Sequence, residues 1–131
     1  YSALGASDEK MLLARAIQMF MPGKPQVWYL DLFAGKNDHE AVRRAGESGH
    51  KEINRTNLST DQITEGLKKD VVQKQLALIR MRNTHKAFSE GAEVAISGGE
   101  RSLEIRWEYN SAFATLYVNF ESGTYTIVES K

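Results

Sequence analysis

The sequence contains no cysteine, only two prolines and no net charge. Without cysteine there is no disulfide framework and no thiolate metal site, so we expect a protein of the reducing cytoplasm. The 17 basic residues balance the 17 acidic ones, and nothing in the overall charge attracts nucleic acid or an anionic membrane surface. No apolar run approaches the roughly 20 residues of a membrane span, and no signal peptide is apparent.

What is present is enough to build a folded core. Of 131 residues, 41% are hydrophobic and 26% are charged, which is typical of one globular domain and not of a disordered chain. Because the first residue is Tyr1 and not methionine, we expect the sequence to be part of a longer protein or a processed product.

The first helix is predicted over residues 8–21. Ser7 is a good N-cap, two acidic residues follow it, and Pro22-Gly23 ends the helix. Nearly every face of this helix is apolar, which normally requires cover on both sides. We therefore expect elements outside this chain to cover part of it.

The apolar run Gln26–Leu30 is typical of a parallel strand that is buried on both faces. A lone parallel strand cannot form a sheet, so its neighbours are expected outside the chain. A long, polar, glycine-rich loop over residues 33–55 follows the strand. The order strand, polar loop and helix is how a (β/α) barrel builds its working face.

Two further helices are predicted after this loop. Ser59 and Gln62 have the spacing of a capping box, and a short helix continues to about residue 67. A second helix covers residues 70–84, with Val72, Leu76 and Ile79 on one buried stripe. His85 follows its end, where a cation suits the helix dipole, so we interpret His85 as structural.

The last third of the chain alternates between apolar and polar residues. Strands are predicted over residues 92–97, 102–109, 112–120 and 124–128, separated by turns at Gly98-Gly99, Asn110-Ser111 and 121–123. This is an antiparallel meander with one buried face. The prediction is an α+β chain that divides near residues 86–91, into residues 1–88 and a small all-β part over residues 89–131.

The sequence offers few candidate catalytic residues. A glycosidase needs two facing carboxylates, and no spacing pairs any two of Asp31, Asp38, Glu40 and Glu52. We interpret most loop acids as solvated. Asp31 lies just past the predicted strand, where barrel enzymes often place functional groups, and the alternative role for it is to cap loop amides. The three histidines are not at metal-ligand spacing, so no metal and no cofactor are predicted.

Anion binding is a second chemistry that the central loop could carry. Lys36, His50, Lys51 and Arg55 place cationic donors in one loop, which suits a phosphate or a carboxylate. The alternative is ordinary salt bridging within the loop. Trp107 could stack on a sugar, but its strict alternation with polar neighbours favours packing in the core.

Four motifs, in order, resemble the C-terminal part of sucrose phosphorylase, a retaining glycoside phosphorylase of the alpha-amylase superfamily. They are Tyr1-Ser2-Ala3-Leu4-Gly5, Pro22-Gly23 with Pro25-Gln26-Val27, Ala34-Gly35-Lys36-Asn37-Asp38, and Ile53-Asn54-Arg55. The resemblance covers residues 1–85 well. It implies that residues 1–88 are the last segment of a (β/α)8 TIM barrel, namely a helix, strand 8, its long loop and the closing helices. The β-sheet domain would follow that barrel.

The resemblance also implies a reaction and a site. A glucosyl group passes from a sucrose-like α-glucoside to an enzyme carboxylate and then to phosphate, giving α-glucose 1-phosphate with retention. The catalytic carboxylates of the family lie in earlier strands, outside this chain. The chain would supply one wall of the acceptor and phosphate subsite, so sugar and phosphate are the expected partners. The residues implied for that wall are Lys36, Asp38, His50, Lys51, Glu52 and Arg55.

One departure from the family pattern bears on the substrate. Lys51-Glu52 stands where Arg-Asp is typical, and lysine keeps the charge of arginine but loses its bidentate geometry. This resembles relatives that act on glucosylglycerate or sucrose 6′-phosphate, whose acceptors are anionic.

Two other functions stay open from the sequence. One is a hydrolase or transglucosidase of the same superfamily, and the other is a stand-alone carbohydrate-binding module. On its own, the 131-residue chain is expected to be inactive and to self-associate through the apolar surface of residues 11–30.

Overall fold

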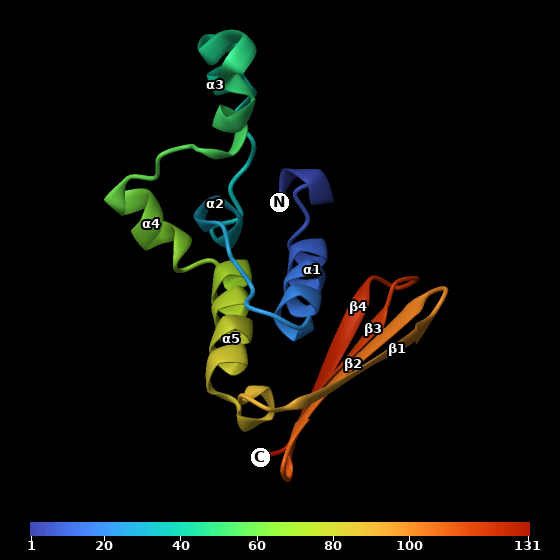
Figure 1. Cartoon of the computed structure of the whole chain (residues 1–131). Helices are drawn as coiled ribbons and strands as arrows, with labels where there is room; N and C mark the ends of the chain where they lie inside the picture. The colour runs from blue at the N-terminus through green and yellow to red at the C-terminus, as the bar shows by residue number, and fades with distance from the viewer.

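The computed structural model describes residues 1–131, which form helices followed by a β-sheet (Figure 1). The α-helices are α1 (Asp8–Phe20), α2 (Tyr29–Leu32), α3 (His39–Ala45), α4 (Thr60–Gly66) and α5 (Asp70–Thr84). Short 3₁₀ segments are η1 (Ser2–Leu4), η2 (Gly46–Asn54) and η3 (Lys86–Phe88), and the strands are β1 (Glu93–Gly99), β2 (Ser102–Tyr109), β3 (Ala112–Asn119) and β4 (Thr124–Glu129).

The four strands form one antiparallel meander in the order β1-β2-β3-β4, as the period-2 pattern predicts. In its register Ile105 faces Leu116 and Trp107 faces Ala114, and all four side chains are buried. The predicted turn at Gly98-Gly99 is wrong by two residues, because both glycines belong to β1 and pair with β2. The sheet therefore offers one continuous apolar face.

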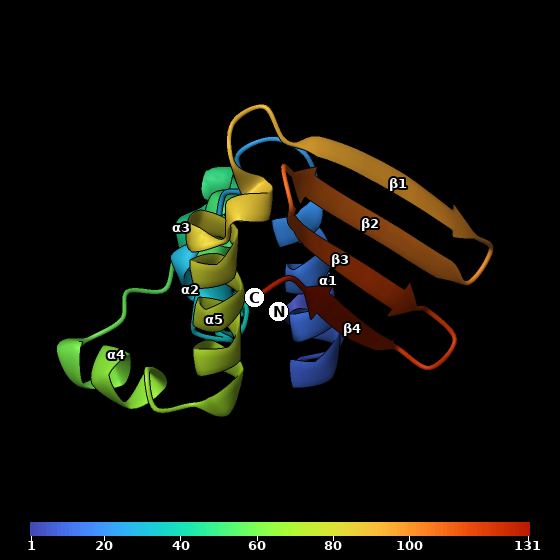
Figure 2. The ribbon, with the colours of Figure 1, turned by 90° about the horizontal axis from the view of Figure 1, so that it is seen from below.

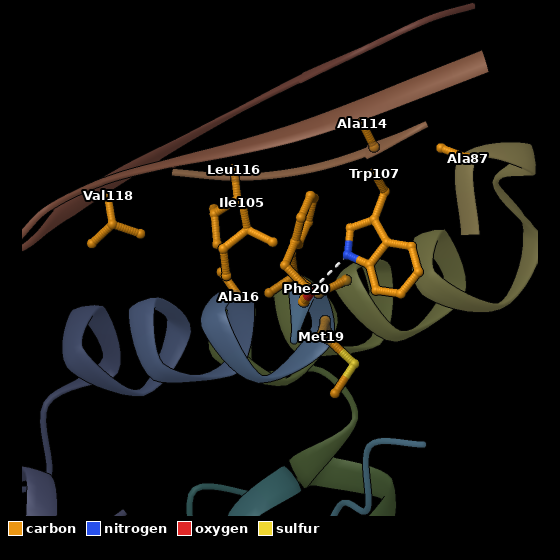
Figure 3. Packing of buried hydrophobic residues seen from close by; sticks show 10 residues of the cluster. Ala16, Met19, Phe20, Ala87, Ile105, Trp107, Ala114, Leu116 and Val118 are labelled. Atoms are coloured by element: carbon orange, nitrogen blue, oxygen red, sulfur yellow. Dashed lines mark hydrogen bonds between the residues drawn. The ribbon is translucent and has the colours of Figure 1, made fainter. Parts of the chain in front are cut away.

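Helix α1 lies between this face and α5 (Figures 1 and 2). Ala16 and Phe20 lie against the apolar side chains of β2 and β3, whereas the buried Met19 points away from the sheet (Figure 3). Near the other end of α1, Met11 packs against Val71 of α5. Much of the apolar surface that we expected other polypeptide to cover is thus covered by α5 and the sheet, so the helices and the sheet share one core.

The predicted strand over residues 26–30 is wrong for this chain. Residues 24–28 have no regular secondary structure, although Trp28 is extended with φ −76° and ψ 136°, and Tyr29 begins α2. A strand needs neighbouring strands for its backbone N–H and C=O groups, and this chain places none beside it. The carbonyl of Gln26 instead accepts a 2.7 Å hydrogen bond from the Gln18 side chain. The sequence pattern identified an extended apolar segment, but a sheet requires partners.

The junction between α5 and the sheet is held by Arg82. Its Nη2 donates to the carbonyl of Gly23 at 3.0 Å, and its guanidinium carbon lies 4.7 Å from the ring centre of Phe88 and 4.4 Å from that of Trp107. Burial lowers the pKa of Arg82. Cation–π contacts with two rings compensate part of that desolvation, so one side chain connects the α1 exit, α5 and β2.

His85 has a structural position, as predicted, but not as a cation at a helix end. Its Nδ1 accepts a 3.2 Å hydrogen bond from the backbone N–H of Ala87, and its Nε2 lies 3.0 Å from the carbonyl oxygen of Ser130. An accepting Nδ1 requires the neutral imidazole, with the proton on Nε2. His85 therefore joins the end of α5 to the end of the chain by hydrogen bonds.

No helix of the fold combines the length and the apolar character needed to cross a membrane.

Candidate functional site

The residues of the predicted anion site lie on a segment that stands away from α1 and α5 (Figure 1). Lys36 precedes α3, Asp38 is its N-cap, His50, Lys51 and Glu52 lie in η2, and Arg55 follows η2. The continuous polar loop that the sequence suggested is therefore wrong, because most of residues 39–54 are helical. The capping carboxylate of Asp38, followed by residues that tolerate helix, explains the difference.

Asp38 organises this segment. Its Oδ1 accepts a 2.9 Å hydrogen bond from the N–H of Ala41, and its own N–H donates to the carbonyl of Ile53 at 2.8 Å. The second bond joins the two ends of the segment. Lys36 and Arg55 each lie two residues from this bond, so the fold brings these two cations to the same end of the segment.

The six candidate residues differ in their charge partners. Arg55 pairs with Glu52 at 3.4 Å, and the Asp38 carboxylate lies 3.8 Å from Arg44. Lys36, His50 and Lys51 are exposed, and neither lysine makes an ion pair within the chain. Ordinary salt bridging thus accounts for Arg55 but leaves Lys36 and Lys51 with their charge available to an anion.

The start of the segment is fixed by close backbone contacts. The N–H of Gly35 donates to the carbonyl of Leu30 at 2.8 Å, and a Cβ at Gly35 would stand 2.3 Å from Cδ1 of Leu30. Ala34 takes a left-handed conformation with φ 51°. Only glycine allows the chain to turn back this closely on Leu30.

Aromatic side chains hold the other end of the segment. The Nε1 of Trp28 donates to the carbonyl of Asn54 at 2.8 Å, and the hydroxyl of Tyr29 donates to the carbonyl of Thr56 at 2.9 Å. The two rings lie 5.0 Å apart between centres. These residues of the predicted strand therefore set where η2 ends.

A buried polar pair beneath this region was missed by sequence reasoning. Arg15 is 6% exposed and Gln75 is 0% exposed, and Arg15 Nε donates to Gln75 Oε1 at 2.9 Å. Burial lowers the pKa of Arg15, while nearby Asp31 opposes that shift. The sequence did contain a signal for the burial of Arg15, because Arg15 is four residues from both Met11 and Met19 on the apolar stripe of the helix.

Asp31 lies apart from the six candidate residues. It lies in the first turn of α2. Together with Arg15 and Trp28 it lines a cleft of about 330 Å³ beside α1, which none of the six candidate residues reaches. No three His, Cys, Asp or Glu side chains gather as a metal site.

Several known proteins are similar to this chain over nearly all of its length. No family model matches the sequence. The chain is 52% identical over 97% of its length to a sucrose 6(F)-phosphate phosphorylase of Ilumatobacter coccineus, of which it covers 24%. It is 42% identical over 99% of its length to a sucrose phosphorylase of Agrobacterium vitis, of which it covers 26%. A glucosylglycerol phosphorylase of Marinobacter adhaerens is 37% identical over 99% of the chain, which covers 27% of it.

A solved structure agrees with these matches. The crystal structure of sucrose 6F-phosphate phosphorylase from Thermoanaerobacter thermosaccharolyticum superposes with a TM-score of 0.91 and 40% identity, over 100% of this chain and 26% of that one. The chain thus spans about a quarter of the length of the relatives that it matches, at their C-terminal part.

Proposed function

We infer that this chain is the C-terminal part of a glycoside phosphorylase related to the sucrose phosphorylases. The whole protein transfers a glucosyl group from a sucrose-like α-glucoside to phosphate and releases α-glucose 1-phosphate with retention of configuration. The observation that carries this proposal is the 52% identity to a sucrose 6(F)-phosphate phosphorylase over nearly the whole chain. The superposition on a solved phosphorylase supports it independently.

The proposed role of this chain is to bind the acceptor and phosphate, and its residues take no part in the bond-breaking steps. The two carboxylates that a retaining mechanism needs come from the remaining three quarters of the protein. Lys36, His50, Lys51 and Arg55 contribute positive charge to the acceptor and phosphate subsite, while Asp38 and Glu52 orient the segment. Support comes from the exposure of Lys36 and Lys51 and from their lack of an internal ion pair.

In the whole protein, the part of residues 26–30 that precedes α2 pairs as a strand of a (β/α)8 barrel. The segment is apolar, its residue Trp28 is extended, and helices α1 and α5 precede and follow it in the chain. Pairing with strands from the rest of the protein satisfies its free backbone groups. The helices over residues 1–88 then belong to the barrel, and residues 89–131 form a small antiparallel domain beside it.

The acceptor of this enzyme is proposed to carry negative charge. Lys51 offers a compact ammonium where a bidentate arginine is typical of sucrose phosphorylases. A lysine binds a phosphate or a carboxylate as a point charge, without the bidentate contact that an arginine makes. Two relatives whose names specify a sucrose phosphate support this direction.

The test is glucose 1-phosphate release by the whole protein that contains this chain. Sucrose, sucrose 6′-phosphate, glucosylglycerol and glucosylglycerate are offered with and without inorganic phosphate. Phosphate-dependent release from one donor supports the phosphorylase and names its acceptor. Free glucose that forms without phosphate assigns the protein to the hydrolases, and products that carry a second sugar assign it to the transglucosidases.

The role of Lys51 is tested by Lys51→Ala in the same protein. We expect the KM for phosphate or for the anionic acceptor to rise about tenfold, as for loss of one charge-assisted contact, with little change in thermal stability. Lys10→Ala, an exposed lysine on α1, is the matched control. Unchanged kinetics of Lys51→Ala would remove Lys51 from the site.

By itself, the 131-residue chain is proposed to be inactive and to self-associate. Met21 and Trp28 are more than 40% exposed, and both belong to the apolar surface of the first 30 residues. Sedimentation velocity decides this point, because a clean monomer at micromolar concentration contradicts the proposal. Sugar binding by the isolated chain would instead favour a stand-alone carbohydrate-binding module.

A further inference from the structure

Gln75 is a fully buried side chain of α5 whose polar groups all point to specific partners. Its Oε1 accepts the 2.9 Å hydrogen bond from Arg15 Nε. Its Nε2 donates to the carbonyl of Leu32 at 3.0 Å and lies 3.4 Å from the carbonyl of Asp31. A buried amide costs free energy unless it is paired on both ends, and here both ends are paired across three separate elements.

Gln75 lies beside carbonyl groups at the C-terminal end of α2, where a helix leaves its carbonyls without intrahelical partners. Asp31 and Leu32 close α2, which has only four residues, and the last carbonyls of a helix lack intrahelical partners. The N–H of Ala34 donates to Asp31, whereas Leu32 receives its hydrogen bond from Gln75. The α2 end lies beside one end of α5 in Figure 1, which brings the two groups together.

The end of α2 determines where the candidate site begins. Lys36 is four residues beyond Leu32, and the chain between them is fixed by the Gly35 N–H bond to Leu30. The N–H of Asn37 then donates to the Ser2 hydroxyl, and the N–H of Asp38 donates to Ile53. A displacement at Leu32 is therefore passed to Lys36 and Asp38 through a short, hydrogen-bonded path.

We propose that Gln75, oriented by Arg15, is a positioning residue that holds the end of α2 and thereby sets where Lys36 and Asp38 meet the phosphate or anionic acceptor. This assignment rests on the proposed function of the same site. It predicts that Gln75 affects phosphate binding although its hydrogen bonds are all made to groups of the protein itself.

Two substitutions separate positioning from simple packing. Gln75→Glu keeps an oxygen that accepts from Arg15 but replaces the donor to Leu32 with an acceptor, so the hydrogen bond at α2 is lost while the contact with α1 is retained. Gln75→Met has a similar volume and loses both contacts. Asn83→Asp, at an exposed position of the same helix, controls for the added charge.

The experiment uses the whole protein and two measurements. Hydrogen exchange of the amides of Gly35, Asn37 and Asp38 reports on the segment directly, and steady-state kinetics report on phosphate. For Gln75→Glu we expect about tenfold faster exchange at these amides and about a tenfold higher KM for phosphate, the size of one lost hydrogen bond. The kcat at saturating phosphate and the exchange of α1 amides should change less than threefold.

Each outcome decides the proposal. Unchanged exchange at the three amides in Gln75→Glu overturns it, and so does a lower melting temperature with unchanged KM for phosphate. If Gln75→Met does not fold, Gln75→Glu still gives the answer. If the wild-type protein shows no phosphate dependence, the proposed function fails, while the exchange data alone decide whether Gln75 positions the segment.

Discussion

The indole Nε1 of Trp107 donates a 2.6 Å hydrogen bond to the carbonyl oxygen of Phe20, the last residue of α1 (Figure 3). The two residues are 87 positions apart in the chain, and both are buried. A carbonyl at the end of a helix lacks an intrahelical partner, so the sheet supplies the hydrogen bond that α1 cannot. This contact fastens β2 to the helical part at the centre of the core.

Replacing Trp107 with phenylalanine removes this hydrogen bond and leaves the Phe20 carbonyl buried without it. We expect the free energy of unfolding to fall by about 1–3 kcal/mol, measured by urea denaturation. Tyr109→Phe is the control, since it removes a hydroxyl from the same strand without removing a hydrogen bond within the chain. An equal loss in both variants would contradict the importance of the Phe20 contact.

Gly35→Ala is expected to disturb the start of the candidate site. Its Cβ would stand 2.3 Å from Cδ1 of Leu30, which is itself buried at 3% exposure and has little room to move. Overpacking of this kind costs about 1–3 kcal/mol, measured as a lower urea midpoint. Gly99→Ala provides the comparison, because its Cβ meets only the Ser102 hydroxyl, at 3.5 Å. Equal stability of Gly35→Ala and the wild type would mean that Leu30 moves aside.

The capping box of α4 makes a local prediction. Ser59 Oγ accepts from the N–H of Gln62 at 3.2 Å, and the Gln62 side chain accepts from the N–H of Ser59 at 2.8 Å. Ser59→Ala should weaken α4 by about 1 kcal/mol, which hydrogen exchange at the amides of Ile63 and Leu67 measures. Ser48→Ala, at an exposed serine outside α4, should leave the exchange at these amides unchanged.

The burial of the Tyr125 hydroxyl leads us to expect a loss of stability at alkaline pH. Burial raises its pKa above the ordinary value of 10.0, and Lys74 opposes this only in part. Above pH 10 the unfolded chain releases the phenolic proton before the folded chain does, so unfolding becomes easier as the pH rises toward the folded-state pKa. The stabilisation of the folded chain by the protonated Tyr125 hydroxyl is complete below pH 10.

The variant Tyr125→Phe removes this titration. The difference in free energy of unfolding between the wild type and Tyr125→Phe should be constant from pH 7 to 9 and should then shift against the wild type as the pH rises. Urea denaturation at several pH values measures it. A difference that stays constant through pH 11 would show that the folded and unfolded chains ionise Tyr125 alike.

Local signals predicted the elements that form without help from distant residues. The cap at Ser7 and the capping box at Ser59 mark two helix starts, and α5 begins and ends where its apolar stripe predicts. Alternation over residues 102–109 gave the face of β2 correctly, since Ile105 and Trp107 are buried. Such signals depend on spacing within one element, which the sequence carries directly.

The candidate site was only partly predictable. The cationic residues were visible as a group, but the helical form of residues 39–54 depends on the Asp38 cap and on its backbone bond to Ile53. The strand predicted over residues 26–30 depends on neighbours that the chain does not contain. Sequence periodicity describes which residues are apolar and not which segments lie beside them.

The sequence by itself therefore determined the starts of α1, α4 and α5, the buried face of β2 and the kinds of residue in the candidate anion site, because each follows from spacing over a few positions. Only the tertiary structure decided that Trp107 meets Phe20, that Arg15 and Gln75 pair inside the core, and that Gln75 holds the end of α2. Those contacts join residues 43 to 87 positions apart, where no local spacing rule applies. They form only when burial of the shared core has brought the elements together.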